Sequence, residues 1–177
     1  MAHIKVADDI PGIRSLIQFR PETGKPLLDL AQALMRGASS LTEAERELIA
    51  AYVSHGNECR FCTYSHAAAA RHLYKDGASI VDEILKNVDV APISDKMRAL
   101  LNIAEKVRIG GKSVTDGDVA LAREYGADDL EIHDTVLIAA AFSMYNRYVD
   151  GLASLTPTEP EAYIEMGRRM AEKGYAM

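Results

Sequence analysis

The stretch LTEAERELIAAYVSHGNECRFCTYSHAAAAR, residues 41–71, decides how this chain folds, because it encodes two helices and the turn between them. Thr42 followed three residues later by Glu45 is a capping-box pattern, which marks a helix start, and Gly56 is a typical helix end. Asn57 is a preferred N-cap residue, so we expect it to open the second helix. The stretch therefore predicts a helical hairpin that turns at Gly56 and Asn57.

Most of the remaining chain shows apolar residues at helical spacing, and glycine or proline separates the segments. No segment shows the sustained alternation of apolar and polar residues that is typical of strands, so we predict an all-α fold. Residues 3–10 are expected to form an extended N-terminal arm. The predicted helices cover about residues 26–36, 42–56, 57–76, 79–88, 94–109, 115–125, 129–153 and 160 onward.

Length and charge limit the class of protein. Of the 177 residues, 48% are hydrophobic and 26% are charged, and the net charge is −6. We expect one globular domain over residues 1–177, with no nucleic-acid or anionic-membrane partner, since those partners require a basic surface. The longest apolar run, residues 136–142, is too short to cross a bilayer, and the N-terminus lacks the pattern of a secretory signal. A cytoplasmic protein is the expectation.

The sequence contains one internal repeat, at an offset of 89 residues. The segment GASSLTEAERELIAAYVSHGN, residues 37–57, aligns with GADDLEIHDTVLIAAAFSMYN, residues 126–146, with nine identities in 21 positions. Helices rich in Ala and Leu resemble one another, but the matching glycine, serine and asparagine positions favour duplication of a helical unit. The second copy has Tyr148 and Gly151 where the first has Cys59 and Cys62.

Cys59 and Cys62 are the only two cysteines, and their spacing points to redox or metal chemistry rather than to a disulfide framework. If the helix begins at Asn57, both thiols lie near its positive N-terminal end, which stabilises a thiolate. His66 follows Cys62 by four residues, so its imidazole lies on the same helix face and can exchange a proton with that thiol. Cysteines at positions i and i+3 can close a disulfide with little backbone movement.

Glu47 is expected to join these residues from the preceding helix. It lies about ten residues before the predicted turn, and His66 lies about nine residues after it, so the two side chains can meet across the hairpin. A carboxylate bonded to an imidazole orients the ring and raises its basicity. The candidate catalytic residues are therefore Cys62, Cys59, His66 and Glu47.

Two other interpretations of the cysteines stay open. A zinc site could use four residues of this segment, His55, Cys59, Cys62 and His66, since many zinc sites contain Cys-x-x-Cys pairs. These residues, however, spread along one helix face rather than around a tetrahedron, and no second ligand pair is recognisable. The two thiols could also simply pack in a core, where free cysteine is common.

The spacing of the four candidates resembles a known signature. Glu47, eleven residues, Cys59, two residues, Cys62, three residues and His66 match the Glu-x11-Cys-x2-Cys-x3-His pattern of the alkyl hydroperoxidase D (AhpD)-like proteins. These proteins belong to the carboxymuconolactone decarboxylase superfamily. By this resemblance, Cys62 is the peroxidatic thiol, Cys59 is the resolving thiol, and Glu47 with His66 forms a proton relay.

The resemblance extends over about residues 20–155. Residues 41–71 look like the core of the family, and FSMYNRYVDGLA, residues 142–153, is similar to the Asn-Arg segment of its peroxidase-related branch. This implies an AhpD-like helical domain that forms a homo-oligomer, a trimer or a hexamer. Phe61 departs from the pattern, because active members often carry His before the second cysteine; His55 is a possible substitute base.

The activity that the resemblance implies is thiol-dependent reduction of a small hydroperoxide. An external thiol, dithiol or protein reductant is then needed, and no bound cofactor or metal, because both electrons reside on the cysteine pair. Two alternatives are a protein that exchanges disulfides with a partner, and a lactone decarboxylase. The Cys-x-x-Cys motif disfavours the lactone decarboxylase, since that chemistry does not depend on it.

Overall fold

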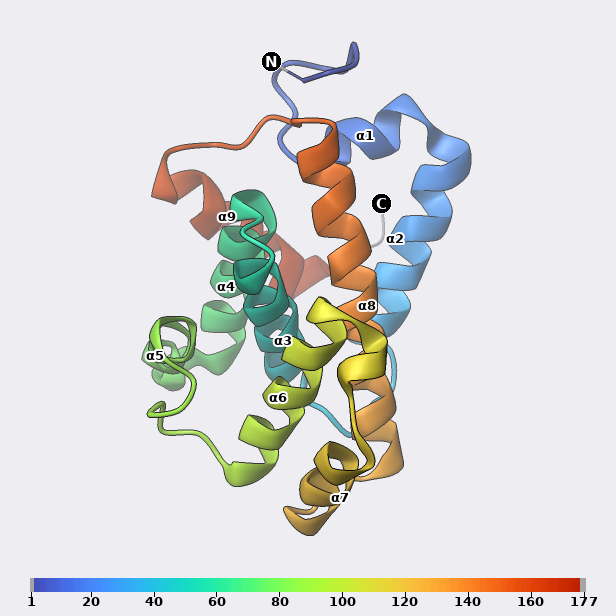
Figure 1. The fold of residues 1–177 in the computed structure, drawn as a ribbon. Helices are drawn as coiled ribbons and strands as arrows, with labels where there is room; N and C mark the ends of the chain where they lie inside the picture. The colour runs from blue at the N-terminus through green and yellow to red at the C-terminus, as the bar shows by residue number, and fades with distance from the viewer. Residues whose placement is uncertain (1, 176–177) are drawn as a thin grey trace.

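The computed structural model describes residues 2–175, which form helices joined by short loops (Figure 1). No strand occurs in residues 2–175, so the all-α prediction is confirmed. None of the helices in this range is both long and apolar enough to cross a membrane. The elements are α1 (Ile13–Phe19), α2 (Pro21–Arg36), α3 (Glu43–Gly56), α4 (Arg60–Tyr74), the 3-10 turn η1 (Lys75–Gly77), α5 (Ser79–Lys86), α6 (Asp95–Ile109), the 3-10 turn η2 (Gly111–Ser113), α7 (Asp116–Glu124), α8 (Asp129–Gly151) and α9 (Pro160–Lys173).

The hydrophobic core is built around α3, which packs against α4, α6 and α8, while α9 packs along α4 (Figure 1). Leu48, Ile49 and Val53 of α3 have no exposed surface. Leu101 of α6 and Phe142 of α8 belong to the same core. Since burial of each large apolar side chain contributes roughly 1.5–3 kcal/mol, this core is the main source of stability and holds α3 and α4 in a fixed position.

Helix boundaries follow the predicted caps except near the N-terminus. The predicted capping box of α3 is present, with Thr42 and Glu45 bonded reciprocally. The sequence predicts no helix at Ile13–Phe19, where the structure has α1, because this helix is short and Gly12 offers no side-chain cap. α2 begins at Pro21 rather than near residue 26, and a proline at the first helical position needs no N–H partner.

The start of α4 also differs from the prediction. Asn57 is not the N-cap; Cys59 is, so the helix begins two residues later than an N-cap at Asn57 would give. Glu58 adopts a left-handed backbone with φ 60°, and this lets the N–H of Cys59 donate to the carbonyl of Ser54 at 3.0 Å. The Asn57 side chain is bonded to α8 instead. Cys59 therefore sits at the helix end and Cys62 is the third residue of α4.

A reciprocal contact joins the two copies of the internal repeat. The amide of Asn57 donates to Asn146 Oδ1 at 2.9 Å and to Ser143 Oγ at 3.3 Å. The amide of Asn146 donates to Ser54 Oγ at 3.0 Å. Both the asparagines and the serines are repeat-equivalent pairs, as expected for two units related by a local two-fold axis, which supports the duplication.

The two copies differ in how they continue. After the shared segment, the first copy breaks between α3 and α4, whereas the second continues as one helix to Gly151. Tyr148 and Gly151 therefore lie inside or at the end of α8, and only the first copy offers a new helix start for its cysteines.

α9 approaches α4 very closely at Gly167. A Cβ atom added there would lie 2.5 Å from both the carbonyl carbon and the Cβ of Ala68, and 2.7 Å from the nitrogen of Ala69. Because two of these atoms belong to the backbone, they cannot move aside without shifting the helix. The absence of a side chain at Gly167 is what allows the two helices to pack.

Gly167→Ala is expected to lower the free energy of unfolding by about 1–3 kcal/mol, because overpacking forces α9 away from α4. Gly117→Ala in α7 is the matched control, since its added Cβ meets its nearest neighbour, Thr115 Oγ1, at an ordinary 3.6 Å. Urea denaturation followed by circular dichroism measures both. Equal stability of the two variants would contradict the close packing of α9 on α4.

Candidate functional site

The two cysteines lie at the first turn of α4 and are free, buried thiols, with 0% of Cys59 and 4% of Cys62 exposed. A hydrogen bond with the Cys62 side chain raises the pKa of Cys59, and burial raises it further. Cys59 therefore keeps its proton near neutral pH. The side chains are within hydrogen-bond reach, as the predicted Cys-x-x-Cys arrangement requires.

Asp150 of α8 also hydrogen-bonds the Cys59 thiol. Burial raises the pKa of Asp150, and the bond from Cys59 offsets only part of that rise. The carboxylate is therefore a proton acceptor placed directly beside Cys59. The sequence offered no signal for this contact, because Asp150 looks like an ordinary polar residue near a helix end.

Glu47 and His66 meet across the hairpin of α3 and α4, as the spacing predicts. Nδ1 of His66 lies 2.7 Å from Oε2 of Glu47, and the Glu47 side chain has no exposed surface. An ionised carboxylate can only accept hydrogen bonds, so Nδ1 carries the proton and Nε2 is the nitrogen left for other partners. The ring of His66 packs edge-on against Phe142, with centroids 4.5 Å apart.

Two further residues hold Glu47, and the sequence analysis missed both. Nη2 of Arg36, at the end of α2, donates to Oε1 of Glu47 at 2.7 Å. The hydroxyl of Tyr175, beyond α9, donates to the same oxygen at 2.7 Å and lies 3.3 Å from Nδ1 of His66. Tyr175 is 128 residues from Glu47, so no local pattern could have linked them. Arg36 reads in sequence as an ordinary basic residue in the last turn of a helix.

These partners determine the charge of the site. Burial alone would raise the pKa of Glu47, but the bonds and charges of its three partners outweigh burial and hold the pKa below its usual value. Burial and the Glu47 charge raise the pKa of Tyr175 well above its usual value, so the hydroxyl stays protonated and donates. Burial lowers the pKa of Arg36, but the charge and hydrogen bond of Glu47, together with Tyr175 and Glu43, outweigh burial, so the net pKa is higher than usual.

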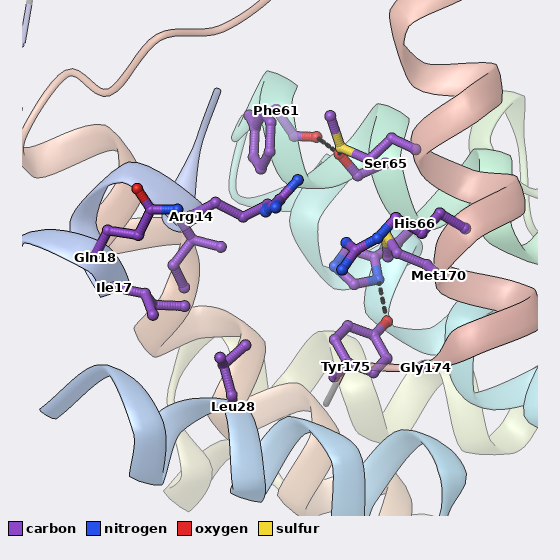
Figure 2. Close-up of a pocket in the computed structure, with 13 residues that line it drawn as sticks. Arg14, Ile17, Gln18, Leu28, Phe61, Ser65, His66, Met170, Gly174 and Tyr175 are labelled. Carbon is purple, nitrogen blue, oxygen red and sulfur yellow. Dashed lines mark hydrogen bonds between the residues drawn. The ribbon is translucent and has the colours of Figure 1, made fainter. Parts of the chain in front are cut away.

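Two adjoining cavities lead to this cluster. The inner cavity, of about 60 Å³, reaches Cys62 and His66. The outer cavity, of about 100 Å³, is drawn in Figure 2, where His66 and Tyr175 lie on one wall. The two cavities share six lining residues: Ile13, Ile17, Leu28, Phe61, His66 and Tyr175. Cys59 lines neither of them.

Phe61, which departs from the signature, is buried and fills the space between the cavities and the N-terminal segment. A Cβ added at Gly12 would lie 2.0 Å from the Phe61 ring, so the ring packs directly on the Gly12 backbone. Phe61 also contacts Tyr163 of α9, with ring centroids 6.3 Å apart. The residue before Cys62 is thus an apolar side chain that lines both cavities.

The remaining candidates lie elsewhere. His55 is exposed and borders a surface groove with Glu58 and Arg60, so it is not part of the buried cluster. Asn146 is buried in the contact between the repeats, and Arg147 bonds the Ser143 carbonyl on the surface. Among residues 2–175, no three His, Cys, Asp or Glu side chains are grouped in a way that could hold a metal ion.

Comparison with known proteins places these features in context. Residues 21–106 match the model of the carboxymuconolactone decarboxylase family. The structure resembles an uncharacterized peroxidase-related protein from a Silicibacter species, with 28% identity, TM-score 0.79, and 90% of this chain and 81% of that chain covered.

Two more solved structures are similar. An uncharacterized peroxidase-related protein with an alkylhydroperoxidase AhpD core, from Ralstonia eutropha, has 28% identity, TM-score 0.79, and coverage of 90% of this chain and 82% of that chain. A protein of unknown function from Agrobacterium tumefaciens has 22% identity, TM-score 0.67, and coverage of 81% and 97%, and shows the fold alone. Curated protein sequences contain no match to the chain.

Glu47→Gln is expected to lower the free energy of unfolding at pH 7 by about 3–5 kcal/mol, because it leaves the buried Arg36 charge uncompensated. Glu43→Gln is the matched control, since Glu43 also faces Arg36, at 3.6 Å, but is 41% exposed; its loss should stay below about 1 kcal/mol.

The difference in the free energy of unfolding between wild type and Glu47→Gln depends on pH. The folded-state pKa of Glu47 lies below the unfolded value of 4.5, so its stabilisation is complete above that pH. It is lost as the pH falls from there through the folded-state value. Urea unfolding of wild type and Glu47→Gln between pH 7 and pH 3 should therefore show a gap that narrows only below about pH 4.5; a constant gap would mean that Glu47 is not ionised.

Proposed function

We propose that the chain is an AhpD-like member of the carboxymuconolactone decarboxylase superfamily and that it acts as a thiol-dependent hydroperoxide reductase. One observation carries the proposal: Cys62 shares the lining of the inner cavity with His66, whereas Cys59 does not line it. The reacting thiol is therefore Cys62, and Cys59 is the resolving thiol.

The reaction balances on the two sulfurs. The Cys62 thiolate attacks the terminal oxygen of the hydroperoxide, an S–O bond forms, the O–O bond breaks, and the alcohol leaves after taking one proton. The Cys59 thiol then attacks the sulfenic acid, which forms the disulfide and releases water. Two external thiols or one dithiol donate two electrons and two protons to restore both thiols, and are themselves oxidised to a disulfide.

His66 is the proton carrier in this proposal. Its Nδ1–H is held by Glu47, so Nε2 is available to take the Cys62 proton and return it to the leaving alcohol. Tyr175 and Arg36 are positioning residues, because they hold the carboxylate that holds the imidazole. Phe61 supplies no second base beside Cys62, so this chemistry depends on His66.

Cys59 and Asp150 fit the resolving step. The raised pKa of Cys59 keeps it a neutral thiol, which can donate a hydrogen bond to the charged Cys62 sulfur. When Cys59 attacks, its proton must leave, and Asp150 is bonded to that thiol. The deep burial of both sulfurs favours a small peroxide over a folded protein as the oxidising substrate.

Mass spectrometry after one equivalent of cumene hydroperoxide tests the assigned roles. Wild type should lose two hydrogens as the disulfide forms. Cys59→Ser should gain one oxygen at Cys62, because the resolving thiol is gone, and the matched variant Cys62→Ser should remain unmodified. Oxidation of Cys62→Ser at Cys59 would reverse the assignment. If the wild-type chain does not react with peroxide but is oxidised by a disulfide reagent, it is instead a disulfide-exchange protein.

We further propose that the protein is a homo-oligomer, a trimer or a hexamer. Leu130, Leu137 and Met144 are spaced by seven residues along α8 and are 45%, 36% and 44% exposed. Residues at this spacing lie on one side of a helix, so they form an apolar stripe that a second copy can cover.

Light scattering at micromolar concentration should therefore return three or six times the chain mass of 19.3 kDa. Leu137→Glu should shift the mass toward that of a single chain, because a charge at the centre of the stripe opposes its burial. A particle of 19.3 kDa for the wild type would overturn the proposed assembly.

A further inference from the structure

Two arginines face the outer cavity. Arg14 extends from α1 and Arg169 from α9, and both line its wall. In Figure 2 the side chain of Arg14 reaches into the cavity toward the wall that carries Phe61 and Ser65. None of the described residues that line this cavity is Asp or Glu. The outer cavity thus combines an apolar wall with two positive charges.

These two charges have no partner in residues 2–175, where neither guanidinium makes a hydrogen bond, an ion pair or a cation–π contact. The neighbouring Arg168, which does not line the cavity, donates to both Glu165 and Glu172. The chain has 26 acidic residues against 20 basic ones, so acidic partners are abundant. Arg14 and Arg169 are therefore available to an anionic ligand in the cavity.

The two cavities together suit a ligand with a reactive group at one end and an anionic group at the other. The inner cavity reaches the Cys62 sulfur, and the outer cavity reaches the arginines, with shared apolar residues such as Ile17 and Leu28 between them. Volumes of about 60 and about 100 Å³ hold a compact apolar body of roughly one ring rather than a long chain. A guanidinium matches the planar shape of a carboxylate and can bind it through two hydrogen bonds.

We propose that the site selects hydroperoxides built from a compact apolar body and a carboxylate, with the carboxylate held by Arg14 and Arg169. This selectivity rests on the proposed function, since it concerns the same Cys62 and His66 site. The hydroperoxide end enters the inner cavity, and the carboxylate stays at the outer one.

Binding of unreactive analogues tests the charge preference without turnover. Isothermal titration calorimetry on the full chain should show para-isopropylbenzoate binding about tenfold more tightly than the neutral, equally shaped para-isopropylbenzamide. The double variant Arg14→Gln/Arg169→Gln should bind both with the affinity of the amide. Arg168→Gln should retain the preference, because Arg168 does not line the cavity and is bonded to Glu165 and Glu172. Equal affinity of the two analogues for the wild type would overturn the proposal.

Turnover separates this inference from the function on which it rests. With a dithiol reductant, kcat/KM for para-carboxycumene hydroperoxide should exceed that for cumene hydroperoxide about tenfold, and the double variant should lose the difference. Equal rates on the two peroxides would overturn the selectivity and leave the peroxidase function standing. Preferential benzoate binding without oxidation of Cys62 by either peroxide would support the anion site and contradict the peroxidase function.

Discussion

The buried carboxylate of Glu47 is the constraint on which the rest of the site depends. An ionised carboxylate with no exposed surface is tolerated in a protein only when other groups compensate its charge and fill its hydrogen-bonding positions. Here the compensating groups come from three different segments: Arg36 ends α2, His66 lies in α4, and Tyr175 follows α9. One functional group thus ties four parts of the chain to one point, and the same bonds that satisfy the charge fix the orientation of the imidazole next to the cavity.

The chemistry of the site depends on a break in a duplicated helix. The two repeat units meet through Asn57 and Asn146, and their sequences are alike up to those residues. Beyond them α8 continues without interruption, whereas the first unit turns at Glu58 and starts a new helix at Cys59. The turn creates a helix N-terminus beside a core that the duplication had already built. The two thiols are thereby held at the most electropositive end of α4, where the second unit has the interior and the last residue of α8.

Sequence patterns predicted most helices and the contact within the helical hairpin, but they did not predict contacts between segments outside that hairpin. The helices and the pairing of Glu47 with His66 follow from caps, glycines and residue spacing within one hairpin. The N-cap prediction at Asn57 is wrong because its side chain is used in a contact with α8, which no rule about isolated helix ends can anticipate. Tyr175 and Asp150 were missed because their partners are distant in sequence. Arg36 was missed because it lies on α2, outside the predicted hairpin, although it is only 11 residues from Glu47. The cavities are equally invisible in the sequence, since α1, α2, α4, α8 and α9 all contribute to them.

The place of Tyr175 in the chain has a consequence for biosynthesis. Its hydroxyl reaches Glu47 from 128 residues further along the sequence. At typical translation speeds of about 5–20 residues per second, Glu47 is made roughly 6–26 s before its tyrosine partner is made. The helical hairpin can form in that interval, because its contacts are short-range. The hydrogen bond from Tyr175 to the Glu47 carboxylate can form only later. The nascent polypeptide therefore carries its two thiols before the tyrosine that completes the hydrogen bonds to Glu47 has been made.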